Sequence, residues 1–188
     1  MIKKILLGVA AIVVVFLLVV AMQPAEFRIT RSSTISGDAS DVFAQIDDFH
    51  NWKNWSPWEK MDPEMKRTFE GETSGVGAIY SWEGNKKVGS GKMTIVESRP
   101  DELVRIKLEF FKPFAATNDT EFSLKDVENG TSVTWTMSGR NGFLGKAMCL
   151  FKNMDKMVGP DFENGLAQMK STVETARQDA QQNSADTE

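Results

Sequence analysis

The side chains best suited to chemistry or binding are concentrated in one short stretch, HNWKNWSPWEK, at residues 50–60. It holds the only histidine, His50, and three of the five tryptophans, Trp52, Trp55 and Trp58. A spacing of three residues places the indole rings loosely on one side of a helical turn. We expect the three rings to form a hydrophobic lid over one end of a curled sheet, with direct contact to a ligand as the alternative interpretation.

The other reactive side chains do not form a recognisable catalytic or metal-binding set. Asp47 and Asp48 are close to His50 in sequence, but successive residues project about 100° apart on a helix. We therefore predict no metal site, and we interpret His50 as a residue at the end of a helix. Cys149, the only cysteine, is expected to be a buried and unreactive thiol. No nucleophile can be paired with a base, so the catalytic residues stay unknown and no cofactor is predicted.

An uncharged apolar run, ILLGVAAIVVVFLLVVAM, occupies residues 5–22. As a helix it is about 27 Å long, close to the thickness of a bilayer's hydrocarbon core. This length favours an uncleaved transmembrane anchor over residues 1–23, although Val19 and Ala21 leave cleavage of a signal peptide open. Lys3 and Lys4 precede the run, so the rest of the chain should face the periplasm or the cell exterior. We expect a single-pass protein of the inner (cytoplasmic) membrane.

The chain after this run is acidic, with 20 lysines and arginines against 26 aspartates and glutamates, a net charge of −6. Phosphate neutralisation dominates binding to nucleic acid, so we predict no nucleic-acid partner. Broad adhesion to anionic headgroups is disfavoured for the same reason. Since one cysteine excludes an internal disulfide, the hydrophobic core must stabilise the domain, and roughly 150 residues suffice for that.

Short strands between helical segments make up the acidic part. Residues 27–36 predict a strand, and residues 41–50 carry apolar side chains at helical spacing. Six runs with a period of two follow between residues 65 and 140, which makes seven strands in total. Residues 143–158, and a segment after Gly159-Pro160 that extends to about residue 176, predict amphipathic helices. Residues 177–188 predict a polar disordered tail, which leaves one domain at residues 24–176.

Antiparallel strands of this kind can bury their apolar face by curling around the terminal helix. We therefore predict an α+β fold, in which a curved antiparallel sheet of about seven strands wraps around a long C-terminal helix. One transmembrane helix precedes this domain.

Several motifs resemble a superfamily with this architecture. They are Ala39 with Val42-Phe43, Phe49-x-x-Trp52-x-x-Trp55-Ser56-Pro57, Gly75-x-Gly77-Ala78 leading into Tyr80-x-Trp82, Gly89-x-Gly91-x-Met93, Thr131-x-Val133-x-Trp135, and Gly159-Pro160-x-Phe162-Glu163-x-Gly165-Leu166. Over residues 27–176 the chain resembles the SRPBCC superfamily of START-like helix-grip proteins, specifically its polyketide cyclase/dehydrase-like bacterial branch. The resemblance implies an internal cavity, which related proteins use for lipids, hormones or enzymatic chemistry, and a tryptophan segment that closes one mouth of it. It implies no catalytic set.

Strand and helix periodicity indicates which residues should face this cavity. Methionine adapts to irregular shapes, so the methionines among them fit a cavity lining as well as ordinary core filling. Gly165, inside the apolar stripe of the last helix, either leaves room or allows close packing. The predicted lining residues are Phe110, Phe122, Trp135, Met137, Met154, Phe162, Leu166 and Met169.

Three hypotheses about function follow. The first is a membrane-anchored domain that binds a hydrophobic or amphipathic small molecule, such as a lipid or a quinone, in its cavity. The second is a cyclase/dehydrase-type enzyme that acts on such a ligand through carboxylates, Tyr80 or Arg105. The third is a ligand-free domain that binds another protein of the cell envelope through Trp58 and the polar sheet face. A cavity smaller than roughly 300 Å³ would favour the third hypothesis.

Overall fold

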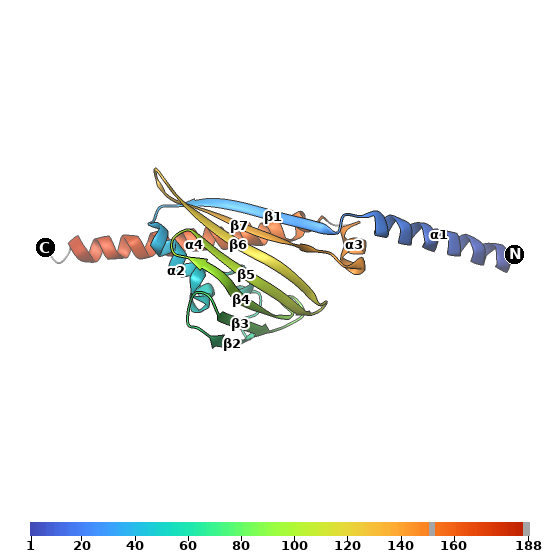
Figure 1. Ribbon diagram of the computed structural model, residues 1–188, viewed down its shortest axis with the longest axis horizontal. Helices are drawn as coiled ribbons and strands as arrows, with labels where there is room; N and C mark the ends of the chain where they lie inside the picture. The colour runs from blue at the N-terminus through green and yellow to red at the C-terminus, as the bar shows by residue number, and fades with distance from the viewer. Residues whose placement is uncertain (151–152, 186–188) are drawn as a thin grey trace.

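The computed structural model describes residues 1–150 and 153–185, and its main feature is one antiparallel sheet (Figure 1). The strands lie in the order β1-β7-β6-β5-β4-β3-β2, so those from β2 to β7 each pair with their neighbour in sequence. The predicted α+β class with seven strands is confirmed. The strands are β1 Glu26–Ile35, β2 Lys66–Gly71, β3 Ala78–Glu83, β4 Ser90–Arg99, β5 Leu103–Lys112, β6 Ala116–Val127 and β7 Gly130–Arg140.

One face of the sheet, called the inner face below, is apolar because side chains alternate along each strand. On β7, for example, Val133, Trp135 and Met137 are buried. The long helix α4, Met154–Ala185, packs against this face. Its buried stripe has helical spacing and consists of Phe162, Leu166, Met169 and Val173.

The helices after the sheet have other bounds than the sequence predicted. α3, Phe143–Cys149, is short and separate, whereas α4 runs through Gly159 and Pro160 without interruption. The predicted break at Gly159-Pro160 is therefore wrong. Gly159 instead lets the guanidinium of Arg31 approach α4, because a Cβ there would collide with it. Arg31, on β1, donates to Asp155 at 2.8 and 3.0 Å and to Glu163 at 2.6 Å, which holds this part of α4 as helix against β1.

The far end of α4 also differs from the expected disordered tail at residues 177–188. The helix continues to Ala185 and projects beyond the sheet (Figure 1), while residues 186–188 lie outside the described residues. Glutamine and alanine, which are good helix formers, are frequent here. Arg177 also donates to Asp38 at 3.3 Å, which ties this stretch to the domain.

The tryptophan segment forms short helical pieces, as predicted. It follows α2, Ala39–Asp47, and contains the 3-10 helices η1, Phe49–Asn54, and η2, Pro57–Lys60. Trp52 Nε1 donates to the carbonyl of Ile46 at 3.0 Å, and Trp55 Nε1 donates to that of Gln45 at 2.8 Å. Because the last carbonyls of a helix lack partners within it, the two indoles cap α2 while their rings enter the core.

The N-terminal helix α1, Ile2–Met22, is the one helix in the described chain that is long and apolar enough to span a membrane. Figure 1 shows it leaving the domain at the start of β1. Its last turns contact the domain, since Val20 is buried and Lys146 of α3 donates to the carbonyl of Ala21 at 3.2 Å. A membrane anchor and a signal sequence both fit this helix.

Candidate functional site

An internal cavity of about 140 Å³ lies between the inner face of the sheet, the tryptophan segment and α4. Strands β3 to β7 form its floor, and η1, η2 and α4 cover it. Its lining residues are Trp52, Ser56, Trp58, Glu59, Met65, Tyr80, Trp82, Lys87, Val88, Met93, Leu108, Phe110, Thr120, Trp135, Met137 and Phe162.

The cavity has a buried interior and a partly exposed edge. Met93 and Phe162 are buried, whereas Trp58 and Trp82 are half-buried and Lys87 is exposed. These three edge residues lie in η2, at the end of β3 and in the β3–β4 connection. The cavity is therefore closest to solvent on the side of η2 and that connection.

Stacked aromatic rings form one interior wall. Trp135 packs face to face on Phe162, with ring centroids 3.9 Å apart and planes at 7°, and it stacks on Phe122 at 4.8 Å. Trp58 meets Trp135 edge-on at 5.7 Å. Aromatic pairs favour stacked and edge-on contacts of this kind, so the stack holds the indole of Trp135 in one orientation.

One carboxylate, that of Glu59, lines the cavity, and two donors bind it. Its Oε1 accepts from the Tyr80 hydroxyl at 2.7 Å, and its Oε2 accepts from Arg67 Nε at 2.7 Å. Burial, together with the hydrogen bond to Glu59, raises the pKa of Tyr80 above its ordinary value of 10.0. Tyr80 therefore stays protonated at neutral pH, with its hydroxyl committed to Glu59.

Two buried polar atoms of the lining residues, Thr120 Oγ1 and Trp135 Nε1, have no hydrogen-bond partner among the described residues. Their residues are only 4 % and 2 % exposed. Thr120 pairs with Met137 and Phe122 with Trp135 along the β6–β7 ladder, so Thr120 and Trp135 are diagonal neighbours on the inner face. Buried polar groups are nearly always hydrogen-bonded, and an unsatisfied one costs about 1–3 kcal/mol. Each atom itself exposes almost no surface, so neither is accessible from the cavity in this structure.

The predicted lining residues are divided between the cavity and the hydrophobic core. Phe110, Trp135, Met137 and Phe162 line the cavity. The others lie away from it: Phe122, Leu166 and Met169 are buried in the core, and Met154 is half-buried at the start of α4. Contact of any of them with a ligand stays a prediction.

The three tryptophans predicted to form a lid lie at different depths. Trp55 is fully buried in the core and does not reach the cavity, whereas Trp52 is buried and lines it. Trp58, half-buried at the edge, is the one of the three that occupies the position a lid requires.

Gly165 serves close packing rather than leaving room. A Cβ at this position would lie 2.9 Å from the ring of Trp135 and 3.1 Å from Pro57. The absence of a side chain therefore lets α4 approach both the aromatic stack and η2.

Periodicity missed some lining residues, among them Leu108 and Thr120. Each occupies an inward position of its strand, so alternation identifies the side of the sheet on which it lies. Alternation does not distinguish inward residues beside a void from those in full contact with neighbours. Thr120 carried one further signal, because it is a hydroxyl residue two positions before the buried Phe122.

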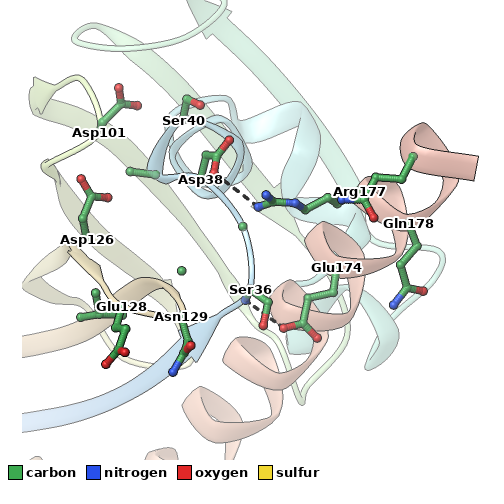
Figure 2. A pocket seen from close by; sticks show the side chains of 15 residues that line it. Ser36, Asp38, Ser40, Asp101, Asp126, Glu128, Asn129, Glu174, Arg177 and Gln178 are labelled. Carbon is green, nitrogen blue, oxygen red and sulfur yellow. Dashed lines mark hydrogen bonds and ion pairs between the residues drawn. The ribbon is translucent and has the colours of Figure 1, made fainter. Parts of the chain in front are cut away.

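A larger hollow of about 940 Å³ lies on the surface, where β1 ends and the β6–β7 turn faces α4. Arg177 pairs with Asp38, and Glu174 accepts from the backbone N–H of Ser36 at 2.9 Å. Open and polar, this hollow is a weaker candidate for an apolar ligand than the internal cavity. Figure 2 shows acidic side chains spread around it, namely Asp38, Asp101, Asp126, Glu128 and Glu174.

The single histidine and the single cysteine do not belong to a cluster of metal-ligating side chains among the described residues. Among the described residues, no three histidine, cysteine, aspartate or glutamate side chains come together as metal ligands would. His50 Nδ1 lies 2.8 Å from Asp48 Oδ1, and its ring stacks on Phe69 at 4.1 Å. Cys149 is half-buried, not fully buried as predicted, and its sulfur accepts from Asn141 Nδ2 at 3.6 Å.

Solved structures of very different sequence share the fold. Protein CV1439 from Chromobacterium violaceum aligns with a TM-score of 0.58 and 14 % identity over 78 % of this chain and 96 % of its own. Protein SA2116 from Staphylococcus aureus aligns with a TM-score of 0.60 and 15 % identity, over 81 % of this chain and 96 % of its own. The di-domain ARO/CYC StfQ from the steffimycin biosynthetic pathway aligns with a TM-score of 0.62 and 10 % identity, over 81 % of this chain and 52 % of its own. At such identities the likeness shows the fold alone.

A family described as polyketide cyclase / dehydrase and lipid transport matches residues 26–174 of the sequence. No curated protein sequence matches the chain. The matched residues begin with β1 and end within α4, so they include the sheet, the tryptophan segment and every lining residue of the cavity. The chain therefore belongs to the polyketide cyclase/dehydrase and lipid transport family.

Proposed function

We propose that this protein is a membrane-tethered domain that binds a small hydrophobic molecule in its internal cavity. The observation that carries the proposal is the cavity itself, which is enclosed by aromatic and methionine side chains at the centre of a sheet-and-helix fold. Concave apolar sites with a few polar groups are the usual form of small-molecule sites. Membership of a family that includes lipid transport agrees with this use.

The size of the cavity limits the ligand. At about 140 Å³ it is smaller than the pockets of roughly 300–1,000 Å³ that hold drug-sized molecules. Apolar cavities of about 150 Å³ hold a benzene molecule. We therefore infer that a single ring or a short chain enters the interior, and that the remainder of a larger ligand extends past Trp58 and Lys87 at the edge.

An apolar surface supports the membrane tether. Three residues separate α1 from β1, so a bilayer around α1 would lie directly beside the domain. The strand register brings the β5–β6 turn to this end, because Asn118 pairs with Gly139 and Glu26 with Arg140. Apolar residues at the end of β5, in that turn and in α3 are exposed, namely Phe111, Phe114, Phe143, Leu144 and Met148. Such residues insert favourably into the headgroup region, and they continue the apolar surface of α1.

The cavity lies toward the same end of the sheet. Phe110, a lining residue, pairs with Ala116 beside the β5–β6 turn and with Gly91 near the start of β4. A molecule dissolved in the bilayer would therefore have a short path to the cavity edge, and the tether would raise its effective concentration. The cytoplasmic placement of Lys3 and Lys4, and hence the side on which the domain lies, stays a prediction.

Two alternatives remain distinct from this proposal. The small cavity favours a ligand-free domain that binds an envelope protein over a carrier that encloses a whole lipid. A cyclase/dehydrase-type enzyme has less support, since Tyr80 donates to Glu59, and Arg105 lies on the outer face with Glu97 and Glu121.

The test uses the methionine methyl groups as reporters in the full-length protein. We expect added benzene to shift the NMR signals of Met93 and Met137, which line the cavity, and to leave that of the core residue Met169 unchanged. The change Leu108→Trp should fill the cavity and abolish the response. Val96→Trp, which adds the same ring at an exposed position of β4, should preserve it. If benzene moves no lining methionine in the parent protein, the ligand-free hypothesis takes precedence.

A further inference from the structure

We propose that the end of the domain next to α1 docks on anionic lipid headgroups through basic side chains that accompany its exposed apolar residues. These side chains, called the basic rim below, are Lys60, Lys86, Lys87, Lys112, Arg140 and Lys146. The inference rests on the membrane tether of the proposed function, and it names the class of lipid that the tethered domain prefers.

Three lysines of the basic rim gather where β4 begins and β5 ends. Lys86 and Lys87 lie in the β3–β4 connection, and both are exposed. Ser90, the first residue of β4, pairs with Lys112 of β5, and a Cβ at Gly89 would collide with the carbonyl of Lys112. Because Lys112 directly precedes the β5–β6 turn, the three lysines lie at the end of the sheet nearest α1.

Lys60 joins this group through η2. Asn85 of the β3–β4 connection donates through Nδ2 to the carbonyl of Met61 at 3.4 Å, and through its backbone N–H to Asp62 Oδ2 at 2.6 Å. These bonds hold the end of η2, and with it the exposed Lys60, against the β3–β4 connection.

Arg140 and Lys146 extend the basic rim toward β1 and α1. Arg140 is exposed at the end of β7, and Lys146 of α3 donates to a carbonyl in the last turn of α1 at 3.2 Å. Phe111 and Phe114, both exposed, flank Lys112 in the sequence. Cationic and apolar side chains thus occur together at this end, which is the combination by which peripheral segments bind anionic bilayers.

Fewer carboxylates than basic groups lie at this end. The acidic residues near the rim are Glu26, Asp62, Glu64 and Glu83. The carboxylate of Glu83 lies 3.6 Å from Lys112 Nζ, and that of Asp62 is buried and accepts from Asn85. Lys66, opposite Glu83 in the β2–β3 ladder, adds one more positive charge. Positive charge therefore remains in excess.

The opposite end of the domain is acidic. Figure 2 shows Asp38, Asp101, Asp126, Glu128 and Glu174 around the polar hollow. At physiological ionic strength a charged surface acts over about 8–10 Å, whereas the 12 residues of β6 extend about 40 Å between the two ends. An anionic bilayer therefore attracts the basic rim without sensing the acidic hollow, even though the chain after residue 22 has a net charge of −6.

The experiment measures how often the β5–β6 turn contacts lipid. In a Cys149→Ser background, the exposed Ala115 of this turn is changed to cysteine and labelled with a fluorophore. The full-length protein is reconstituted into phosphatidylcholine vesicles that contain a nitroxide-bearing phosphatidylcholine, and quenching gives the ratio of docked to undocked domains. We expect this ratio to rise severalfold when about a third of the lipid is replaced by phosphatidylglycerol.

Salt provides a first check that charge causes the rise. Raising the ionic strength from about 0.1 to 1 M shortens the Debye length from about 10 to 3 Å. The rise with phosphatidylglycerol should then disappear, whereas docking on pure phosphatidylcholine, which depends on the apolar side chains, should persist.

Matched variants assign the effect to the basic rim. A lysine near an anionic surface changes the docked-to-undocked ratio about fivefold, so Lys86→Gln/Lys87→Gln should lose most of the rise. Lys86→Arg/Lys87→Arg keeps both charges and should keep the rise. Lys53→Gln/Lys125→Gln removes two exposed lysines of η1 and of the far end of β6, and it should also keep the rise. Like Lys86 and Lys87, these two form no ion pair with a described residue.

The outcomes separate this inference from the proposed function. If the parent docks equally on both kinds of vesicle, or if Lys86→Gln/Lys87→Gln keeps the full rise, recognition of anionic lipid by the basic rim is overturned while the tether stands. If the label is quenched in neither kind of vesicle, this end of the domain does not reach the bilayer, and the membrane contact fails together with the inference.

Discussion

Trp55 shows at the scale of a residue what the tryptophan segment contributes to stability. Its ring is fully buried among Trp52, Phe122 and Trp135, and its N–H is bonded to the carbonyl of Gln45. We expect Trp55→Ala to lower the free energy of unfolding by about 3–5 kcal/mol, measured by urea denaturation. Trp58→Ala, at the half-buried edge, should cost less. An unchanged unfolding midpoint for Trp55→Ala would mean that the ring serves something other than the core.

Tyr80 predicts a specific response to alkaline pH. Its pKa is raised in the folded protein, mainly by burial and then by the bond to Glu59, so the folded state holds the phenolic proton more tightly than the unfolded state. The resulting stability is fully present below the unfolded pKa near 10 and is lost as pH rises above it. Tyr80→Phe should therefore weaken the fall in unfolding free energy above about pH 10. Tyr80 is the only tyrosine, so no second phenol contributes to the difference.

That experiment requires the slopes of stability against pH, since Tyr80→Phe also leaves Glu59 Oε1 without its donor and lowers stability at every pH. Lysines titrate in the same range in both proteins and cancel. Identical slopes in the parent and in Tyr80→Phe would contradict the raised pKa.

At the scale of elements, the strands were predictable because their signal is local. Val133, Trp135 and Met137 alternate with polar residues within a single strand, and this pattern alone defines the buried face. The junction of α3 and α4 was not predictable in this way. Continuity of α4 through Pro160 is accompanied by contacts from Arg31, which is 124 residues away from Asp155 in sequence. No local sequence pattern predicts a contact between residues so far apart in the chain.

The cavity was partly predictable for a related reason. Periodicity placed Phe110, Trp135, Met137 and Phe162 on inward faces, and these residues do line the cavity. The position of the void along the sheet depends on side-chain volumes across several strands, η2 and α4 together. The Glu59–Tyr80 bond joins η2 to β3, so it becomes visible only once those two elements are placed.

Arg31 gives a prediction that belongs to α4 as an element. Arg31→Gln removes the ion pairs to Asp155 and Glu163, so the first turns of α4 should open more often. Amide hydrogen exchange of residues 156–163, other than Pro160, which has no N–H, should then become faster. Arg177→Gln removes the single contact to Asp38 at the other end of the helix and should leave those amides unchanged. Equal protection of residues 156–163 in the parent and in Arg31→Gln would show that packing alone holds this part of α4.

The same contact has a defined pH dependence. The hydrogen bonds from Arg31 lower the pKa of Asp155 below its ordinary value of 3.8. The stabilisation is therefore present above that ordinary value and is lost as pH falls through the lowered pKa. The difference in exchange between the parent and Arg31→Gln should accordingly disappear under strongly acidic conditions.

At the scale of the whole molecule, α1, the exposed apolar residues and the cavity lie toward one end of the sheet. α1 contacts α3 through Lys146 and Ala21, and the β5–β6 turn ends beside the same region by strand register. The polar hollow shown in Figure 2 and the projecting part of α4 lie at the other end. This polarity fits a domain that faces the bilayer with one end and the aqueous compartment with the other.

The polarity predicts which residues contact lipid. In a Cys149→Ser background, Leu144→Cys on α3 and Val127→Cys at the end of β6 are each labelled with an environment-sensitive fluorophore in the full-length protein. Both positions are apolar and comparably exposed, 50 % and 43 %. They differ in location, because β6 spans 12 residues, or about 40 Å of strand, between the end near α1 and Val127.

After reconstitution into vesicles, the label at residue 144 should emit at shorter wavelength and be quenched by nitroxide-bearing lipids, since the headgroup region accommodates apolar side chains. The label at residue 127 should behave as it does in water. Equal, water-like emission at both positions would contradict membrane docking of this end. Fractionation of cells tests the tether itself. If the soluble fraction, and not the membrane fraction, contains a shortened protein that lacks α1, the helix acts as a cleaved signal and the proposed tether is wrong. The cavity binds or fails to bind benzene independently of that result, so the membrane contact and the ligand are tested separately.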